Sequence, residues 1–321
     1  MIFPTIVRLV ALLSALSPLL IHAQAPESLM VVEAYSGKIL IAANSSVKRP
    51  VASLTQLATA VVAVDWASAT ESDISQLVIT APPTVALVGG PNPMNLQPGD
   101  TLTLRDALYS ALLGSDNLAA LTIANHVGSQ ILTKRGKAGD PVAAFVDEMN
   151  KLAGLIGMEN TKFVNPHGLE RPRAKGYSCA ADVARLGIFA MRRNALNFIV
   201  RQKERQISVM GATGKRGYLV HNPNELLGEE GIIGIKTGAS AGAGPCLATC
   251  MDREPLVRAR PDGSKGATPR RLIVVLLNSG DRFGRSRSLL RDGWSIYDAW
   301  LKDGAPVKEA HREILAVPAP N

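Results

Sequence analysis

Strand-forming segments lie near both ends of this 321-residue chain, and helix-forming segments occupy the stretch between them. Two apolar runs, residues 29–35 and 38–43, flank Ser36-Gly37, a pair typical of a β-hairpin turn. Three further runs with strand character come far downstream, at residues 232–237, 246–251 and 272–278. This order predicts one α+β domain in which the two ends of the chain meet in a single sheet.

The central segments carry helix start signals. Thr103-Leu-Arg-Asp106 is a capping box that opens a helix through Leu113. Asp140-Pro141 combines a capping residue with proline at the first helical position, ahead of residues 142–156. Apolar periodicity predicts four more helices, at residues 54–67, 118–127, 180–193 and 286–300.

Two stretches are interpreted as loops. Residues 211–217 are rich in glycine, but their spacing fits no phosphate-binding P-loop and no strand-then-helix pattern surrounds them. Residues 252–271 are rich in Lys and Arg and lie between two predicted strands. We interpret them as a solvated loop, with a basic hairpin extension that touches an anionic polymer as the alternative.

The composition limits the classes of partner and cofactor. An apolar share of 46% excludes a disordered chain, and a net charge of +8 allows an acidic cell-wall polymer, anionic lipid or nucleic acid as partner. Nucleic acid is disfavoured, because the basic residues are scattered and only 4% of residues are aromatic. The five histidines lack metal-ligand spacing, so we expect no metal and no other cofactor.

The N-terminal residues are typical of an export signal. Arg8 precedes an apolar run over residues 9–21, which is shorter than the ~20 residues that span a bilayer. Ile21-His22-Ala23 offers a cleavage site. We expect a signal peptide over residues 1–23, an exported protein in the periplasm or cell wall, and no stable membrane anchor; an uncleaved anchor is the alternative.

Three cysteines, Cys179, Cys246 and Cys250, leave at least one thiol unpaired. If Cys246 and Cys250 share a strand, they lie about 13 Å apart, which is too far for a disulfide. We therefore interpret the cysteines as small buried hydrophobic residues.

Three short clusters carry chemistry. Ser53 lies at the start of an apolar helix, Ser115-Asp116-Asn117 forms a turn between two helices, and residues 234–238 end a buried strand with Lys-Thr-Gly. Each cluster alone is explained by capping or by strand termination. In this order, however, they match the Ser-x-x-Lys, Ser-x-Asn and Lys-Thr-Gly motifs of penicillin-interacting serine acyl-transferases.

The chain resembles the serine D-alanyl-D-alanine carboxypeptidases, which are low-molecular-mass penicillin-binding proteins. The resemblance covers residues 28–300. The segments that carry it are 52–60, 96–106, 114–117, 163–169, 235–238 and 282–290. It implies the β-lactamase/DD-peptidase-like fold, an α+β fold with a five-stranded, mostly antiparallel sheet packed between helices, a helical subdomain, and an active site between the two. It also implies peptidoglycan stem peptides as substrate and β-lactam antibiotics as acylating ligands.

The resemblance implies a role for each motif residue. Ser53 would be the nucleophile, and the backbone N–H groups of Ser53 and Ala239 would form the oxyanion hole. Ser115 would relay a proton to the leaving amine, and Asn117 would hold the peptide. The substrate's carboxylate would be bound by a group of residues at a strand end and on the last helix: Lys236, Thr237, Gly238 and Arg282. The peptide would add as a strand along residues 232–238.

One position departs from the family pattern, because Gln56 stands where the motif has lysine. A neutral lysine can accept the serine's proton, whereas a glutamine amide has no useful basicity, and losing a general base costs about 10²–10⁴-fold in rate. Either Lys236 acting through Ser115, or a hydroxide, serves as the base, or the protein only binds wall peptides. Asp116 is a weaker candidate base, since family geometry turns it aside. We expect that Ser53 can be acylated.

Two further departures concern specificity and the C-terminus. Ala239-Ser240 replaces the usual aromatic–Thr pair of the family. A class A β-lactamase is disfavoured, because no Glu-x-x-Leu-Asn follows the second motif. We expect residues 301–321 to form a C-terminal tail, too short for the extra β-rich domain and amphipathic anchor that many family members carry.

Overall fold

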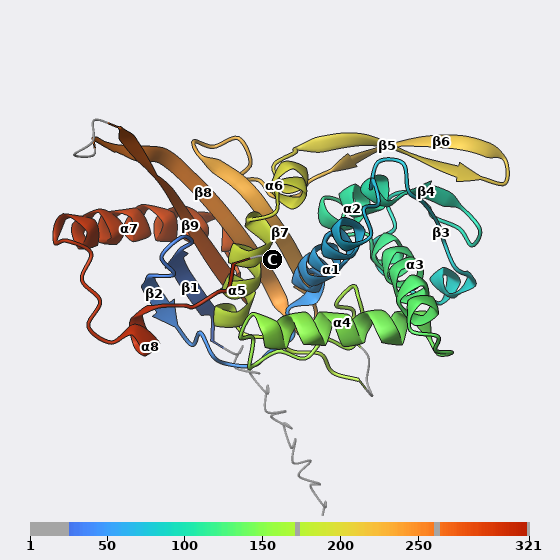
Figure 1. The fold of residues 1–321 in the computed structure, drawn as a ribbon, viewed down its shortest axis with the longest axis horizontal. Helices are drawn as coiled ribbons and strands as arrows, with labels where there is room; N and C mark the ends of the chain where they lie inside the picture. Colours follow the sequence, from blue (N-terminus) through green and yellow to red (C-terminus); the bar gives the residue numbers. More distant parts are fainter. Residues whose placement is uncertain (1–25, 171–173, 260–263, 320–321) are drawn as a thin grey trace, which may run out of the picture.

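The structure is a computed structural model that describes residues 26–170, 174–259 and 264–319. The predicted signal peptide, residues 1–23, lies outside the described residues. Five strands form one antiparallel sheet in the order β2-β1-β9-β8-β7 (Figure 1). Their bounds are β1 Ser28–Glu33, β2 Ile39–Ala43, β7 Ile232–Ser240, β8 Gly244–Ala259 and β9 Lys265–Leu277. The prediction that the two ends of the chain meet in one sheet is confirmed, since β1 pairs with β9.

Alternation of side chains along β1 and β9 gives this sheet an apolar layer on each face. Leu29 and Val31 of β1 point toward Trp294 of helix α7 (Arg282–Lys302). Met30 and Val32 point the other way, into the main core. That core is built with α1 (Thr55–Ala69) and α5 (Ala180–Met191), so the sheet is packed between helices as predicted.

The remaining helices lie beside α1 and form the predicted helical part of the protein (Figure 1). They are α2 Leu104–Leu112, α3 Asn117–Lys134, α4 Pro141–Leu155 and α6 Asn194–Val200, with the short 3₁₀ segments η1 Ala52–Leu54 and η2 Pro83–Leu87. Both predicted caps are confirmed. The Thr103 hydroxyl accepts from the Asp106 N–H, and the Asp140 carboxylate accepts from the Val142 N–H.

The prediction that residues 211–217 form a loop is wrong. They belong to a hairpin of β5 (Glu204–Gly211) and β6 (Gly214–His221), part of a second sheet in the order β3-β4-β5-β6. Its other strands are β3 Val78–Thr80 and β4 Thr101–Thr103. The glycines obscured a strand pattern in which Ile207, Val209 and Val220 are buried on one face while their neighbours are exposed or partly exposed.

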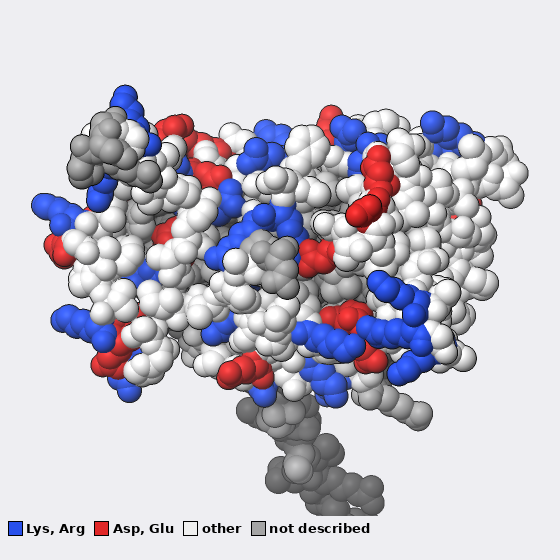
Figure 2. All heavy atoms as spheres, in the orientation of Figure 1, with Lys and Arg blue, Asp and Glu red and all other residues white. Residues whose placement is uncertain are grey.

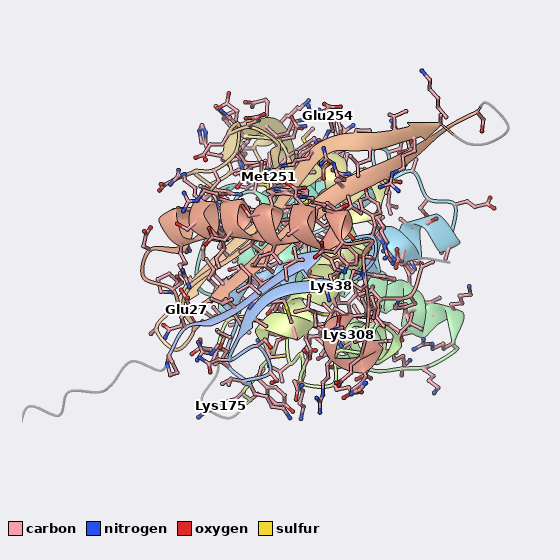
Figure 3. All side chains as sticks on the ribbon, turned by 90° about the vertical axis from the view of Figure 1, so that its left-hand side faces the viewer. Glu27, Lys38, Lys175, Met251, Glu254 and Lys308 are labelled. Atoms are coloured by element: carbon pink, nitrogen blue, oxygen red, sulfur yellow. The ribbon has the colours of Figure 1, made fainter. Side chains whose placement is uncertain are left out.

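The interpretation of residues 252–271 as a solvated loop is also wrong. Strands β8 and β9 continue into this segment, with Leu256 opposite Thr268 and Val257 opposite Ala267. The resulting two-stranded arm, residues 252–259 and 265–271, projects beyond the sheet (Figure 3, beside Glu254). The arm is stabilised by backbone hydrogen bonds between its strands and by ion pairs such as Arg271–Asp252, rather than by an apolar face.

All three cysteines are free and buried, which confirms their interpretation as small buried side chains. Burial raises the pKa of the Cys179 and Cys246 thiols to about 11 and that of the Cys250 thiol to about 12. These thiols are therefore protonated at neutral pH.

Part of the segment 301–321 packs against the domain. After the short helix α8 (Ala310–Glu313), the Leu315 N–H donates to the Gly37 carbonyl at 2.7 Å, and the Leu315 side chain joins the main core. Lys38 on the β1–β2 turn forms an ion pair with Glu313 (Figure 3 labels Lys38). No helix within the described ranges is long and apolar enough to cross a membrane.

Candidate active site

The fold brings the three motif clusters together from distant parts of the chain. Ser53 lies in η1, directly before α1, and the turn containing Ser115 connects α2 to α3. Lys236 lies in the edge strand β7, whose Gly238 packs against the backbone of η1. The motifs that the sequence analysis singled out therefore meet where the edge of the five-stranded sheet faces the helices.

The backbone around Ser53 is held in an unusual conformation. Ala52 has φ +47°, in the left-handed region that residues other than glycine rarely adopt. Gly168 packs against it so closely that an added Cβ would lie 1.9 Å from the Ala52 carbonyl oxygen. Ser53 itself is partly exposed at the N-terminal end of α1, where the helix favours developing negative charge.

Gln56 lies one helical turn after Ser53 and is completely buried. Its Nε2 donates to the Ser115 carbonyl oxygen at 3.2 Å and to Asn117 Oδ1 at 3.1 Å. Its Oε1 is buried without a hydrogen-bond partner in the described structure. The residue at the lysine position thus connects α1 to both ends of the Ser-Asp-Asn turn.

Asn117 is covered by a loop that the sequence analysis did not single out. Its side-chain Nδ2 donates to the Gly89 carbonyl at 3.0 Å, and its backbone N–H donates to the Pro91 carbonyl at 3.0 Å. An added Cβ on Gly90 would lie 2.2 Å from Asn117 Nδ2, so glycine is needed for this approach. The available signal was the Gly-Gly-Pro sequence itself, which marks a turn but not what the turn covers.

Asp116 is buried, and its carboxylate makes its hydrogen bonds with α2 and α3. Its carboxylate caps α3 by accepting from the N–H groups of Leu118 and Ala119, and it accepts the Ser110 hydroxyl at 2.8 Å. Burial raises the pKa of Asp116 to about 6, although these hydrogen bonds oppose the shift. The Asp116 carboxylate therefore caps α3 and holds the Ser110 hydroxyl.

Lys236 has 1% of its surface exposed, and its amine donates to the Ser115 hydroxyl and to the Thr237 carbonyl. Burial, helped by the positive charge of Arg282, lowers the pKa of Lys236 to about 7. A substantial fraction of this amine is therefore neutral near neutral pH and able to accept a proton. No hydrogen bond among the described residues joins the Ser53 hydroxyl to Lys236 or Ser115.

The remaining predicted residues lie along the end of β7. An added Cβ on Gly238 would lie 3.3 Å from the Ser53 nitrogen and 3.1 Å from the Val51 carbonyl oxygen, so the two backbones are in close contact. Thr237 is buried, whereas Ala239, which follows Gly238 along the strand, is exposed.

Arg282, the first residue of α7, reaches this strand from the last helix. Its Nη1 donates to the Gly238 carbonyl at 2.9 Å and to the Cys246 carbonyl at 3.2 Å. Burial lowers the pKa of the Arg282 guanidinium.

The end of β7 carries one contact that sequence reasoning missed. The Ser240 hydroxyl donates to the Glu170 carboxylate, which follows the loop containing Gly168. No sequence signal linked these two residues, because 70 positions separate them. Across the parts of the chain that the structure describes, no group of three or more His, Cys, Asp or Glu side chains could hold a metal ion.

The sequence of this chain is similar to those of known proteins. A family model described as D-alanyl-D-alanine carboxypeptidase matches residues 15–257. A D-alanyl-D-alanine endopeptidase of Pseudomonas aeruginosa is 28% identical over 234 residues, which cover 71% of this chain and 68% of that protein. The D-alanyl-D-alanine carboxypeptidase DacF of Bacillus subtilis is 26% identical over 222 residues, which cover 69% of this chain but only 52% of that protein.

The fold is also that of a solved structure. The crystal structure of the Streptomyces K15 DD-transpeptidase superimposes with a TM-score of 0.68 at 23% identity. The superposition covers 83% of this chain and 96% of the transpeptidase, and it establishes a shared fold.

Proposed function

Because the chain belongs to the D-alanyl-D-alanine carboxypeptidase family of serine peptidases, we propose that it removes the terminal D-alanine from peptidoglycan stem peptides through an acyl-enzyme on Ser53. The observation that carries this proposal is the contact between the Lys236 amine and the Ser115 hydroxyl, on the strand whose Gly238 packs against the backbone of Ser53. We also propose that the protein acts outside the cytoplasm, in the periplasm or cell wall, where this polymer lies.

The first chemical step is the attack of the Ser53 hydroxyl oxygen on the carbonyl carbon of the penultimate D-alanine. The backbone N–H groups of Ser53 and Ala239 stabilise the resulting oxyanion. The close packing of Gly238 on Ser53 supports this arrangement, because it holds both segments within reach of one carbonyl oxygen.

Lys236 is the proton acceptor in this proposal, with Ser115 between it and Ser53. The proton leaves the Ser53 hydroxyl, passes by way of Ser115 to the neutral Lys236 amine, and returns to the nitrogen of the departing D-alanine as the C–N bond breaks. Water then hydrolyses the Ser53 ester and releases the shortened peptide. A pKa of about 7 for Lys236 suits this task, since a base works best when its pKa is near the working pH.

Substrate binding uses the end of β7. The peptide adds as a strand along β7, which is at the edge of its sheet. Thr237 and Arg282 bind the terminal carboxylate, and Arg282 already lies across the end of the strand through the Gly238 carbonyl. β-Lactam antibiotics acylate the same serine.

A second candidate function is peptide binding without turnover. Gln56 favours it, because a carboxamide cannot accept the serine's proton as the family's lysine does. The two candidates share the fold and the ligand, and they differ only in whether Ser53 becomes acylated.

The deciding experiment is intact mass spectrometry after incubation with benzylpenicillin, on the native protein, Ser53→Ala and Gln56→Lys. We expect a penicilloyl adduct on the native protein and none on Ser53→Ala. The rate of adduct formation should rise with pH and level off above about pH 7, as Lys236 becomes neutral. An adduct on Gln56→Lys but none on the native protein would overturn the catalytic proposal and leave the binding function.

A further inference from the structure

We propose that Gln56 is a positioning residue, whose carboxamide holds the Ser-Asp-Asn turn so that the Ser115 hydroxyl stays on the Lys236 amine. This inference rests on the proposed function of the same site. It assigns to Gln56 the hydrogen-bonding role that a lysine at this position can fill, and leaves the acceptance of the proton to Lys236.

The carboxamide connects two segments through a single nitrogen. Gln56 Nε2 donates to the Ser115 carbonyl oxygen at one end of the turn and to Asn117 Oδ1 at the other. Both bonds originate on α1, the helix that begins at Thr55, directly after the η1 segment that contains Ser53. The turn is therefore fixed relative to the nucleophile's own helix.

The turn needs such support because its backbone is strained. Ser115 has φ +54°, in the left-handed region, and a residue other than glycine persists there only when its surroundings hold it. Two neighbouring backbone hydrogen bonds also hold the turn. The Asp116 N–H donates to the Ser110 carbonyl of α2, and the Asn117 N–H donates to the Pro91 carbonyl of the loop over Asn117. Gln56 supplies the bond to the carbonyl of Ser115 itself.

A role in packing alone does not explain glutamine at this position. Its Oε1 is buried without a partner in the described structure, and a buried unsatisfied oxygen is unfavourable. An apolar side chain of similar length would avoid that cost. Glutamine is favoured only if the two hydrogen bonds donated by Nε2 matter.

Loss of those bonds has a defined consequence. The Ser115 carbonyl oxygen and Asn117 Oδ1 would both lose their donor, so the turn would relax and the Ser115 hydroxyl would move off the Lys236 amine. Arg282, from α7, is the other charged group that acts on this amine, and the Asp116 carboxylate accepts the Ser110 hydroxyl. The Thr237 carbonyl also accepts from this amine but belongs to the same strand as Lys236, so a change in the Lys236 titration on substitution of Gln56 is expected to follow the Ser115 contact.

The test compares Gln56→Met, which keeps the length but donates no hydrogen bond, with Gln56→Lys, which still donates. Gln56→Leu, which likewise donates no hydrogen bond and adds no charge, is a second variant in case the methionine variant does not fold. Thr122→Val is the matched control. Thr122 is buried on α3, the helix of Asn117, but its hydroxyl donates only to the Leu118 carbonyl of its own helix.

Two quantities are measured: the titration of the Lys236 amine, by NMR of protein with isotope-labelled lysine, and the rate constant for acylation by benzylpenicillin between pH 6 and 9. In Gln56→Met we expect Lys236 to titrate at lower pH, because its charged form loses an acceptor, and acylation to fall at least tenfold. Gln56→Lys should keep native acylation or exceed it, and Thr122→Val should change neither quantity.

The two readouts separate this inference from the proposed function. An unchanged Lys236 titration in both Gln56→Met and Gln56→Leu overturns the positioning role, whatever the acylation rates are. If the native protein forms no adduct but the Lys236 titration shifts in these variants, the positioning role stands and catalysis by Lys236 is rejected.

Discussion

Two ionisable groups are buried within the same small site, and burial moves their pKa values toward each other. The pKa of Asp116 is raised to about 6 and that of Lys236 is lowered to about 7. Their partners give them different tasks. Asp116 caps α3 with its carboxylate, whereas Lys236 directs its amine at the Ser115 hydroxyl.

Asp116 gives a prediction about stability and pH. Its pKa in the folded protein, about 6, lies above its ordinary value of 3.8, so between these pH values the folded state binds more protons than the unfolded state. Stability from this group is therefore lost as pH rises through that interval. Asp116→Asn keeps an oxygen for the N–H groups of Leu118 and Ala119 and removes the buried charge. Relative to the native protein, it should gain roughly 2–3 kcal/mol on going from pH 4 to pH 7.

Urea unfolding of native protein and Asp116→Asn at pH 4 and pH 7 tests this. Asp140→Asn is the control, because Asp140 caps α4 in the same way but is exposed. Equal pH dependence in the native protein and Asp116→Asn would show that the carboxylate is not destabilised by burial.

At the residue scale, the sequence singled out the motif residues and suggested the pairing of Lys236 with Ser115, but it did not predict their other contacts. The order and spacing of the three motifs selected Ser53, Ser115 and Lys236, because acyl transfer needs these residue types. The contact of Asn117 with Gly89 and the unpartnered oxygen of Gln56 depend on how distant segments pack. Such packing leaves no local signal in the sequence.

At the scale of elements, the position of β7 against η1 sets the geometry of the site. Gly238 forms this contact, and a Cβ there would lie 3.1–3.3 Å from backbone atoms of Val51, Ser53 and Leu54. Backbone cannot rotate away as a flexible side chain can. The two elements would have to separate by a few tenths of an ångström.

Gly238→Ala should therefore impair both folding and acylation. We expect a loss of about 1–3 kcal/mol in stability, as for overpacked sites, and a fall of at least tenfold in the acylation rate with benzylpenicillin. Gly154→Ala, in α4, is the control, since no atom lies within 4 Å of its added Cβ, and it should leave acylation unchanged. Native acylation by Gly238→Ala would contradict the close contact of β7 with η1.

Elements with local start signals or clear apolar patterns were predicted well, and strands rich in glycine or charged residues were missed. The capped helices α2 and α4 begin where Thr103 and Asp140 indicated. The β5–β6 hairpin and the arm were taken for loops, because their glycines and charged residues conceal the alternation of strands. Cross-strand backbone bonds, which no sequence pattern records, hold both together.

At the scale of the whole molecule, the fold follows from the chain's two ends meeting in one sheet. Helices inserted between the terminal strands then cover one face, and α7 covers the other (Figure 1). The charged residues are scattered over the surface, as they are along the sequence. On the face shown in Figure 2, Lys and Arg side chains lie interspersed with Asp and Glu.

The C-terminal segment adds a last contribution to this closure, since it returns to the β1–β2 turn. Leu315 is 3% exposed within the main core, and its backbone pairs with Gly37. Leu315→Ala would remove a buried side chain and leave a cavity that the surrounding elements do not fill. We therefore expect it to lower the free energy of unfolding by about 2–4 kcal/mol. Val307→Ala should cost less than about 0.5 kcal/mol, because Val307 is 44% exposed.

Chemical denaturation of both variants distinguishes a structural segment from a loosely attached tail. Equal stability of the two variants would mean that the domain holds together without Leu315. Acylation by benzylpenicillin should be unchanged in both, since this contact lies at β2, the edge of the sheet opposite to β7.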